Sequence, residues 1–121
     1  MLYAILCYHY EDVVTSWTKE QDDEVMERLG VVHQRLHEEG KLGPAVRLAP
    51  TSRATTLKKD REAPLVIDGP FAETKEQLLG FYIIDGESLE AVLDIARDLA
   101  RANPGGSYEI RPVSLYLPGT L

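Results

Sequence analysis

Two short stretches of the sequence are apolar on both alternating faces, and they restrict the fold more than any other feature. Residues 2–10 (LYAILCYHY) and residues 80–84 (GFYII) carry apolar or aromatic side chains at almost every position. Successive side chains of a strand point to opposite faces, so strands of this kind must be covered on both sides. We therefore expect both stretches to lie at the centre of a sheet.

A long amphipathic helix is predicted over residues 19–39. Thr18 followed by Gln21 has the spacing of a capping box, and Gly40 stands where a helix would end. Apolar residues recur between them at helical spacing. They are Val25, Leu29, Val32 and Leu36, with Met26 beside them.

A second helix is expected after Ser88, which can cap it, and before the breaking residues 103–106 (NPGG). Its predicted apolar stripe consists of Leu89, Val92, Leu93, Ala96, Leu99 and Ala100. Residues 107–113 then alternate in the manner of a strand, and Pro112 places that strand at a sheet edge.

Three short extended segments are predicted in the middle of the chain, at residues 42–48, 54–59 and 65–67. Prolines and a polar turn separate them. The last two pieces are expected to pair as a hairpin.

The order of these elements predicts an α+β chain with a single domain spanning residues 1–121. It is the βαββαβ order of the ferredoxin-like fold, in which both helices cover one face of an antiparallel sheet. The other face would then expose Tyr3, Ile5 and Cys7, or else the opposite set. Because so large an apolar patch is unusual on a monomer, we expect a homodimer closed sheet against sheet.

Composition narrows the function classes. The 121 residues carry a net charge of −7, which disfavours nucleic acid as a partner, and no apolar run reaches the roughly 20 residues of a membrane span. The start of the chain has no signal-peptide pattern, so we expect a cytoplasmic protein. The single cysteine, Cys7, is expected to be a buried and inert thiol. No cofactor or metal motif is present, and none is predicted.

The segment DGPFAETKEQLLGFYIID, with RLAPTSRATTLKK before it and SYEIRPV after it, resembles the YCII-related family in its DGPF-domain branch. The resemblance extends over nearly the whole chain. It implies a dimeric α/β-barrel version of the ferredoxin-like fold and a link to extracytoplasmic-function sigma factors. It also implies acid/base chemistry by a His and Asp pair in a cleft near the dimer interface.

The chain departs from that family pattern on its first long helix. The common form resembles VMxxHxxFxxxLxxxG, whereas this chain reads VMERLGVVHQRLHEEG and has Leu29 where the histidine would fall. His33 lies one turn further along the same helix, from which an imidazole could reach the same cleft.

The DGPFAETKE segment supports two interpretations. Asp68, Gly69 and the following proline form a turn in their own right, with the carboxylate accepting backbone N–H groups, or Asp68 orients a histidine or a ligand. Phe71 is expected to anchor the loop on the core, with contact to a ligand or partner as the alternative. Glu73, Lys75 and Glu76 are expected to form a solvated face that starts a helical turn, with contact to a ligand or partner as the alternative.

Other candidates lie on the sheet. His9 is expected to be an interface histidine, with a catalytic role as the alternative. Tyr82 is a candidate ligand contact. Arg111 is expected to form an ion pair with Glu109 along the last strand, or to clamp a substrate.

Two functions remain open on this basis. The first is a homodimeric binding or regulatory module, linked to a sigma factor and using the DGPFAETKE segment for contact. The alternative is a lyase or isomerase type enzyme acting on a small, aromatic substrate through Asp68 with His33 or His9. A third, purely structural possibility is that the segment only seals the dimer.

Overall fold

The computed structural model describes residues 1–121 and contains a four-stranded antiparallel sheet in the order β2-β5-β1-β6. Its strands are β1 (Leu2–His9), β2 (Leu42–Arg47), β5 (Gln77–Asp85) and β6 (Ser107–Pro112). The two strands that are apolar on both faces, β1 and β5, are the central pair, as expected. β6 is an edge strand, which agrees with the position of Pro112. The order is that of the ferredoxin-like fold, so this prediction is confirmed.

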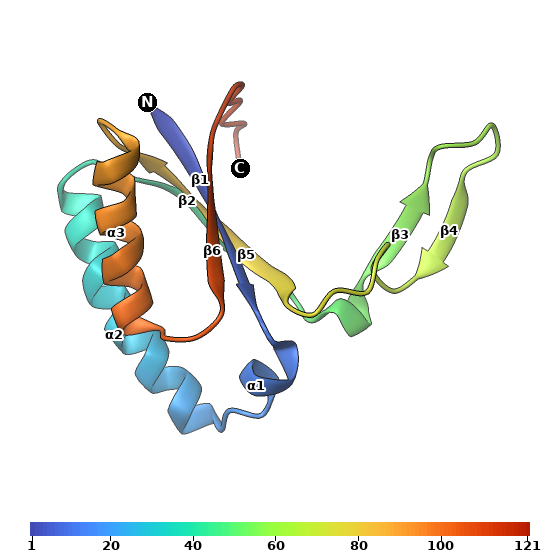
Figure 1. Cartoon of the computed structure of the whole chain (residues 1–121), viewed down its shortest axis with the longest axis horizontal. Coiled ribbons are helices and arrows are strands. Elements are labelled where there is room, and N and C mark those ends of the chain that lie inside the picture. The colour runs from blue at the N-terminus through green and yellow to red at the C-terminus, as the bar shows by residue number, and fades with distance from the viewer.

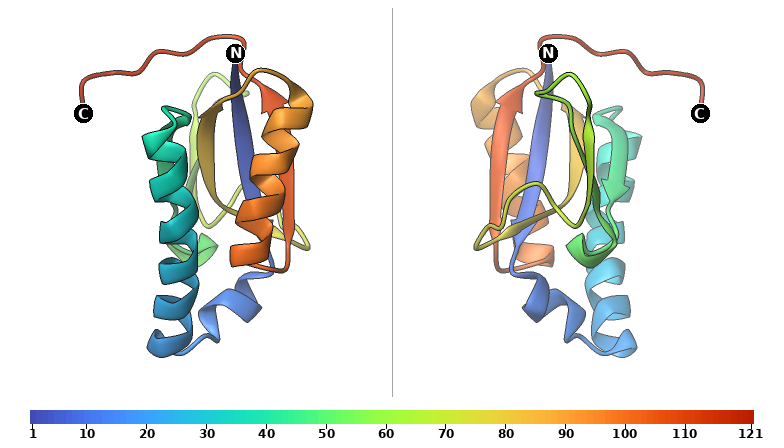
Figure 2. Two further views of the ribbon diagram at one scale, coloured as in Figure 1. Left: turned by 90° about the vertical axis from the view of Figure 1, so that its left-hand side faces the viewer. Right: turned by 90° about the vertical axis from the view of Figure 1, so that its right-hand side faces the viewer.

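Two long helices, α2 (Lys19–Glu38) and α3 (Leu89–Ala102), lie side by side over one face of the sheet (Figures 1 and 2). The predicted capping box starts α2: the Gln21 amide donates to the Thr18 hydroxyl over 3.1 Å, and the Thr18 amide donates to the Gln21 side chain over 2.9 Å. A short helix not predicted from the sequence, α1 (Glu11–Thr15), joins β1 to α2. None of these helices has the length and apolar character that crossing a bilayer requires.

The core lies between the sheet and these two helices. Tyr3 and Ile5 of β1 and Tyr82 and Ile84 of β5 are buried, and they pair across the strands in register. This settles which face of β1 the helices cover: the side with Tyr3 and Ile5. The open face of the sheet consists of Ala4, Leu6, Val46, Phe81 and Ile83.

The predicted stripe of α3 needs a correction. Leu89 is half exposed and Ala100 is exposed, whereas Ile95 and Ala102 belong to the buried set. The buried stripe is therefore rotated around the helix axis relative to the predicted one. In α2 the expected Val25, Leu29 and Leu36 are all buried.

A two-stranded arm leaves the sheet between β2 and β5. After a single 3₁₀ turn, η1 (Thr51–Arg53), strands β3 (Thr55–Lys58) and β4 (Leu65–Asp68) pair as the expected hairpin. Figure 1 shows this arm on the side of the sheet away from α2 and α3. At its base the Glu11 carboxylate accepts hydrogen bonds from the Thr51 amide and hydroxyl, each over 2.7 Å. We call residues 51–76 the arm.

Candidate functional site

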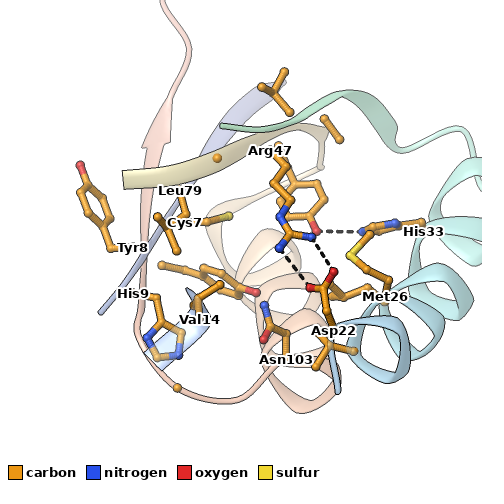
Figure 3. A pocket seen from close by; sticks show the side chains of 18 of the residues that line it. Cys7, Tyr8, His9, Val14, Asp22, Met26, His33, Arg47, Leu79 and Asn103 are labelled. Carbon is orange, nitrogen blue, oxygen red and sulfur yellow. Dashed lines mark hydrogen bonds and ion pairs between the residues drawn. The ribbon is translucent and has the colours of Figure 1, made fainter. Parts of the chain in front are cut away.

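A largely apolar pocket of about 250 Å³ lies at the end of the sheet where β1 stops, between the strands and α2 (Figure 3). All four strands of the main sheet contribute side chains to it, together with α1, α2 and the chain just after α3. Twelve of its 19 lining residues are hydrophobic. Mostly apolar clefts or cavities with a few polar groups are the usual form of small-molecule sites. This volume is just below the roughly 300–1,000 Å³ of pockets for drug-sized ligands, so it suits a smaller molecule.

One wall of the pocket carries a histidine–tyrosine pair. His33 Nε2 of α2 lies 2.8 Å from the hydroxyl oxygen of Tyr82 on β5, and Figure 3 shows both side chains at the pocket. Desolvation by burial lowers the pKa of His33 and raises the pKa of Tyr82 to about 12. At neutral pH both partners are therefore uncharged, with the phenol protonated.

Leu29 and His33 both line this pocket. Leu29 occupies the position at which the family pattern has a histidine, and it is also part of the buried core. His33, one turn further along α2, presents its ring to the same cavity. His33 and Leu29 thus share one pocket, while a catalytic role for His33 stays a prediction.

Cys7 and Tyr108, which also line the pocket, are neutral as well. Burial raises the pKa of the Cys7 thiol to about 12 and raises the pKa of Tyr108 above its ordinary value. The Cys7 thiol also lies 3.7 Å from the Ile5 carbonyl oxygen, which accepts its weak hydrogen bond. Cys7 is only partly buried, and its raised pKa agrees with the expected unreactive character of the thiol.

An ion pair crosses from β2 to α2 at the same site. Arg47 donates from its two terminal nitrogens to the Asp22 carboxylate, over 3.0 and 3.4 Å (Figure 3). The two side chains are 56% and 34% exposed, so water screens the pair and its own contribution to stability is small. Its effect on the pocket is to neutralise both charges.

His9 is buried beside the pocket under the turn that follows α3. Its Nδ1 accepts the Tyr10 backbone N–H over 2.7 Å, and its ring meets the edge of Trp17. A side chain on Gly105 would collide with His9 Nε2, so glycine is required there for the chain to pass over the ring. His9 therefore has a packing role in this chain, and its roles at an interface or in catalysis stay predictions.

Asp68 lies at the end of β4 on the arm and is not among the residues that line the pocket with His9 and His33. The next residue, Gly69, has φ 103° and donates its backbone N–H to the Ala54 carbonyl over 2.7 Å. This hydrogen bond continues the β3–β4 pairing, and the chain only bends at Gly69, with the positive φ that was expected there. The Asp68 carboxylate is exposed and is not the acceptor of the turn, contrary to expectation.

The rest of the DGPFAETKE segment forms an irregular loop. Phe71 is 81% exposed, so the expectation that it anchors the loop on the core is wrong for the single chain. Glu73 and Lys75 are exposed and lie outside any helix, which also corrects the expected helical turn. Instead the Thr74 hydroxyl donates to the Glu76 carbonyl over 2.6 Å and fixes a short turn. Phe71 and Glu73 line a second hollow of about 670 Å³, in which four of the 12 lining residues are hydrophobic.

Arg111 is exposed on β6, where it pairs in register with Ala4 next to the open face. It forms no ion pair with Glu109, so the expected same-strand pair is absent. Sequence patterns gave no signal for Asp22, Arg47, Asn103 or Tyr108 as pocket residues, because each comes from a different element and only the tertiary fold brings them together.

Fold and pocket together define an α+β protein of ferredoxin-like topology with one small, mostly apolar cavity between sheet and helix. A profile of the YCII-related domain matches residues 1–116. The chain is also 57% identical, over 122 aligned residues, to an uncharacterized protein of Rhizobium meliloti (strain 1021), covering 100% of this chain and 98% of that protein. The chain belongs to the YCII-related domain family.

Proposed function

We propose that this chain is a binding module that holds a small, largely apolar molecule in the pocket beside His33 and Tyr82. The observation that carries the proposal is the chemistry of that cavity: about 250 Å³ of space, mostly apolar walls and a few neutral polar groups. Apolar walls supply affinity, and a few fixed polar groups select orientation.

A pocket-filling variant tests this proposal. Met26 lines the pocket yet is 43% exposed, so Met26→Trp should fold and occupy the cavity. Val31→Trp, on the outer side of the same helix at 71% exposure, is the matched control. Toluene should shift the amide NMR signals of pocket residues in the original protein and in the control, but not in Met26→Trp. Absence of such shifts in the original protein would overturn the proposal.

An acid/base enzyme is the second candidate, and the 2.8 Å contact between His33 and Tyr82 favours it. A neutral imidazole in a desolvated pocket can accept a proton, and a protonated phenol can donate to a developing oxyanion. Within one chain the partner of His33 is thus Tyr82. A role for Asp68 in the same chemistry requires the arm of a second copy to deliver its carboxylate.

Deuterium uptake distinguishes the two candidates. An acid/base site of this kind should speed exchange of the α-protons of cyclohexanone in D₂O, followed by NMR. His33→Gln and Tyr82→Phe should abolish the acceleration, whereas His37→Gln, an exposed histidine on the same helix, should retain it. If deuterium exchange proceeds at the same rate with and without protein, the result would favour the binding module over the enzyme.

We extend the proposal to a homodimer closed through the open face of the sheet. That face presents Ala4, Leu6, Val46, Phe81 and Ile83, and the arm lies on the same side (Figure 1). A second copy offers the same apolar surface, as a twofold interface requires. Phe81→Asp should give a folded monomer in sedimentation analysis, while Val31→Asp should remain dimeric. If the unmutated protein sediments as a monomer even at a concentration on the order of 100 μM, the proposed dimer is contradicted.

The resemblance of the DGPFAETKE segment supports a further proposal of cellular role: a cytoplasmic regulatory module of the DGPF-domain branch that works with an extracytoplasmic-function sigma factor. The exposed Phe71, Glu73 and Lys75 would make the contact. Capture of the purified sigma factor should be lost in the double variant Glu73→Ala/Lys75→Ala and retained in Asp68→Ala. Equal capture by all three proteins would count against it.

A further inference from the structure

We infer that the pocket selects an uncharged ligand that carries an N–H or O–H group, and that Asn103 is the residue that accepts this hydrogen bond. The inference rests on the proposed binding function and narrows it to a ligand class. Toluene-like molecules would fill the space, but a phenol, an indole or a primary amide would also satisfy Asn103.

Asn103 follows the last residue of α3 and lines the pocket, as Figure 3 shows. Its side-chain oxygen Oδ1 is buried and has no hydrogen-bond partner in the chain; no other buried side-chain nitrogen or oxygen lacks one. A buried amide oxygen without a donor is costly, and native structures rarely contain one without a reason. A donor on a bound molecule would remove that cost.

Three other polar groups of the pocket are engaged within the chain. The Tyr82 hydroxyl is paired with His33, the Cys7 thiol with the Ile5 carbonyl, and the Arg47 guanidinium with Asp22. Tyr108 adds a hydroxyl that can donate or accept. Asn103 Oδ1 is therefore the one buried side-chain acceptor of the pocket without a partner, whereas the Tyr108 hydroxyl and the second ring nitrogen of His33 are further groups that a ligand can meet.

Charge at the site excludes ionic ligands from this class. Arg47 and Asp22 neutralise each other, and the histidine, thiol and phenol groups are held in their neutral forms by burial. A carboxylate or ammonium would lose its hydration on entering these apolar walls without gaining an unpaired partner of opposite charge. A neutral donor pays a much smaller desolvation cost.

Four probes of similar size test the inference by NMR titration: phenol, anisole, toluene and benzoate. Phenol should bind roughly five- to tenfold more tightly than anisole or toluene, the ratio that one net hydrogen bond supplies. Benzoate should bind no better than toluene. In Asn103→Leu, which has a similar volume and no acceptor, phenol should lose its advantage while toluene still binds.

The outcomes separate this inference from the proposed function. Equal affinities for phenol and toluene in the original protein would overturn the donor assignment and leave the binding pocket standing. Tighter binding of anisole or benzoate than of phenol would also overturn it. Failure of every probe to bind would overturn both. If Asn103→Leu does not fold, the ratio of phenol to anisole affinity in the original protein decides the matter.

Discussion

His33 Nε2 lies 2.8 Å from the hydroxyl oxygen of Tyr82, and this contact joins the long helix α2 to the central strand β5 across 49 residues of sequence. The rings themselves are 5.4 Å apart and tilted by 58°. Since both groups are neutral, the bond is an ordinary one between uncharged partners. The bond connects His33 in the pocket wall to Tyr82 of the core. The second ring nitrogen of His33 has no partner in the chain and is available for other contacts.

Removal of the Tyr82 hydroxyl should destabilise the protein modestly. Tyr82→Phe keeps the buried ring and loses one hydrogen bond, so we expect the free energy of unfolding to fall by about 1 kcal/mol. Urea denaturation followed by circular dichroism measures this, with an unchanged slope. Tyr116→Phe in the C-terminal tail is the control and should leave the midpoint in place. An unchanged midpoint in Tyr82→Phe would show that the bond contributes nothing in solution.

The pKa of His33 predicts the direction of a pH effect on stability. Burial lowers this pKa in the folded state, below the value of about 6.5 that it has in an unfolded chain. Below pH 6.5 the unfolded state therefore binds more protons than the folded state. The contribution of His33 is fully present above about pH 6.5 and is lost as the pH falls through the window beneath that value.

Urea midpoints measured between pH 7.5 and pH 5 should consequently fall less steeply in His33→Gln than in the original protein. His37→Gln, on the exposed side of α2, should keep the original slope. An NMR titration in which the measured pKa of His33 equals or exceeds that of His37 would contradict the lowered pKa of His33.

The Cys7 thiol should react slowly in the folded protein. With its pKa raised to about 12, the thiolate that attacks alkylating reagents is nearly absent at pH 8. Iodoacetamide should label Cys7 at least about tenfold more slowly in buffer than in guanidinium chloride, where the pKa returns to roughly 8.5. Since this is the only cysteine, mass spectrometry of the whole protein follows the reaction without peptide mapping. Rapid labelling of the folded protein would mean that the pocket opens readily.

Leu36 anchors α2 on the sheet. Its side chain is fully buried, so Leu36→Ala should lower the free energy of unfolding by roughly 2–5 kcal/mol through lost contacts and a cavity. Leu117→Ala, at a position that is 79% exposed, is the matched control and should change the stability little. A small loss at Leu36 would indicate that the helix repacks to fill the space.

Most of the fold could be predicted from local and periodic patterns in the sequence. Thr18 and Gln21 mark the start of α2 because a capping box involves only neighbouring residues, and the apolar character of both faces of β1 and β5 identifies the central strands. The sequence could not show which face of β1 the helices cover, because its two alternating sets are almost equally apolar. Phe71 was expected to pack on the core because an aromatic side chain usually does, yet the arm holds it away from the sheet.

The pocket was harder to foresee. His33 was identified because it lies one turn from the position where the family pattern has histidine. Asp22 and Arg47 meet across 25 residues, and Asn103 reaches the pocket only because α3 ends above the turn that covers His9. No spacing in the sequence encodes such contacts, since they depend on how three separate elements pack.

The arm connects two strands that are already neighbours in the sheet, β2 and β5, and none of its residues lines the pocket. The entropy of closing a flexible loop grows only with the logarithm of its length, by roughly 0.6 kcal/mol for each doubling. Shortening the connection between residues 47 and 77 would therefore change the cost of closing the sheet very little. The length and the exposed surface of the arm can therefore change in evolution while the cavity beside His33 keeps its form.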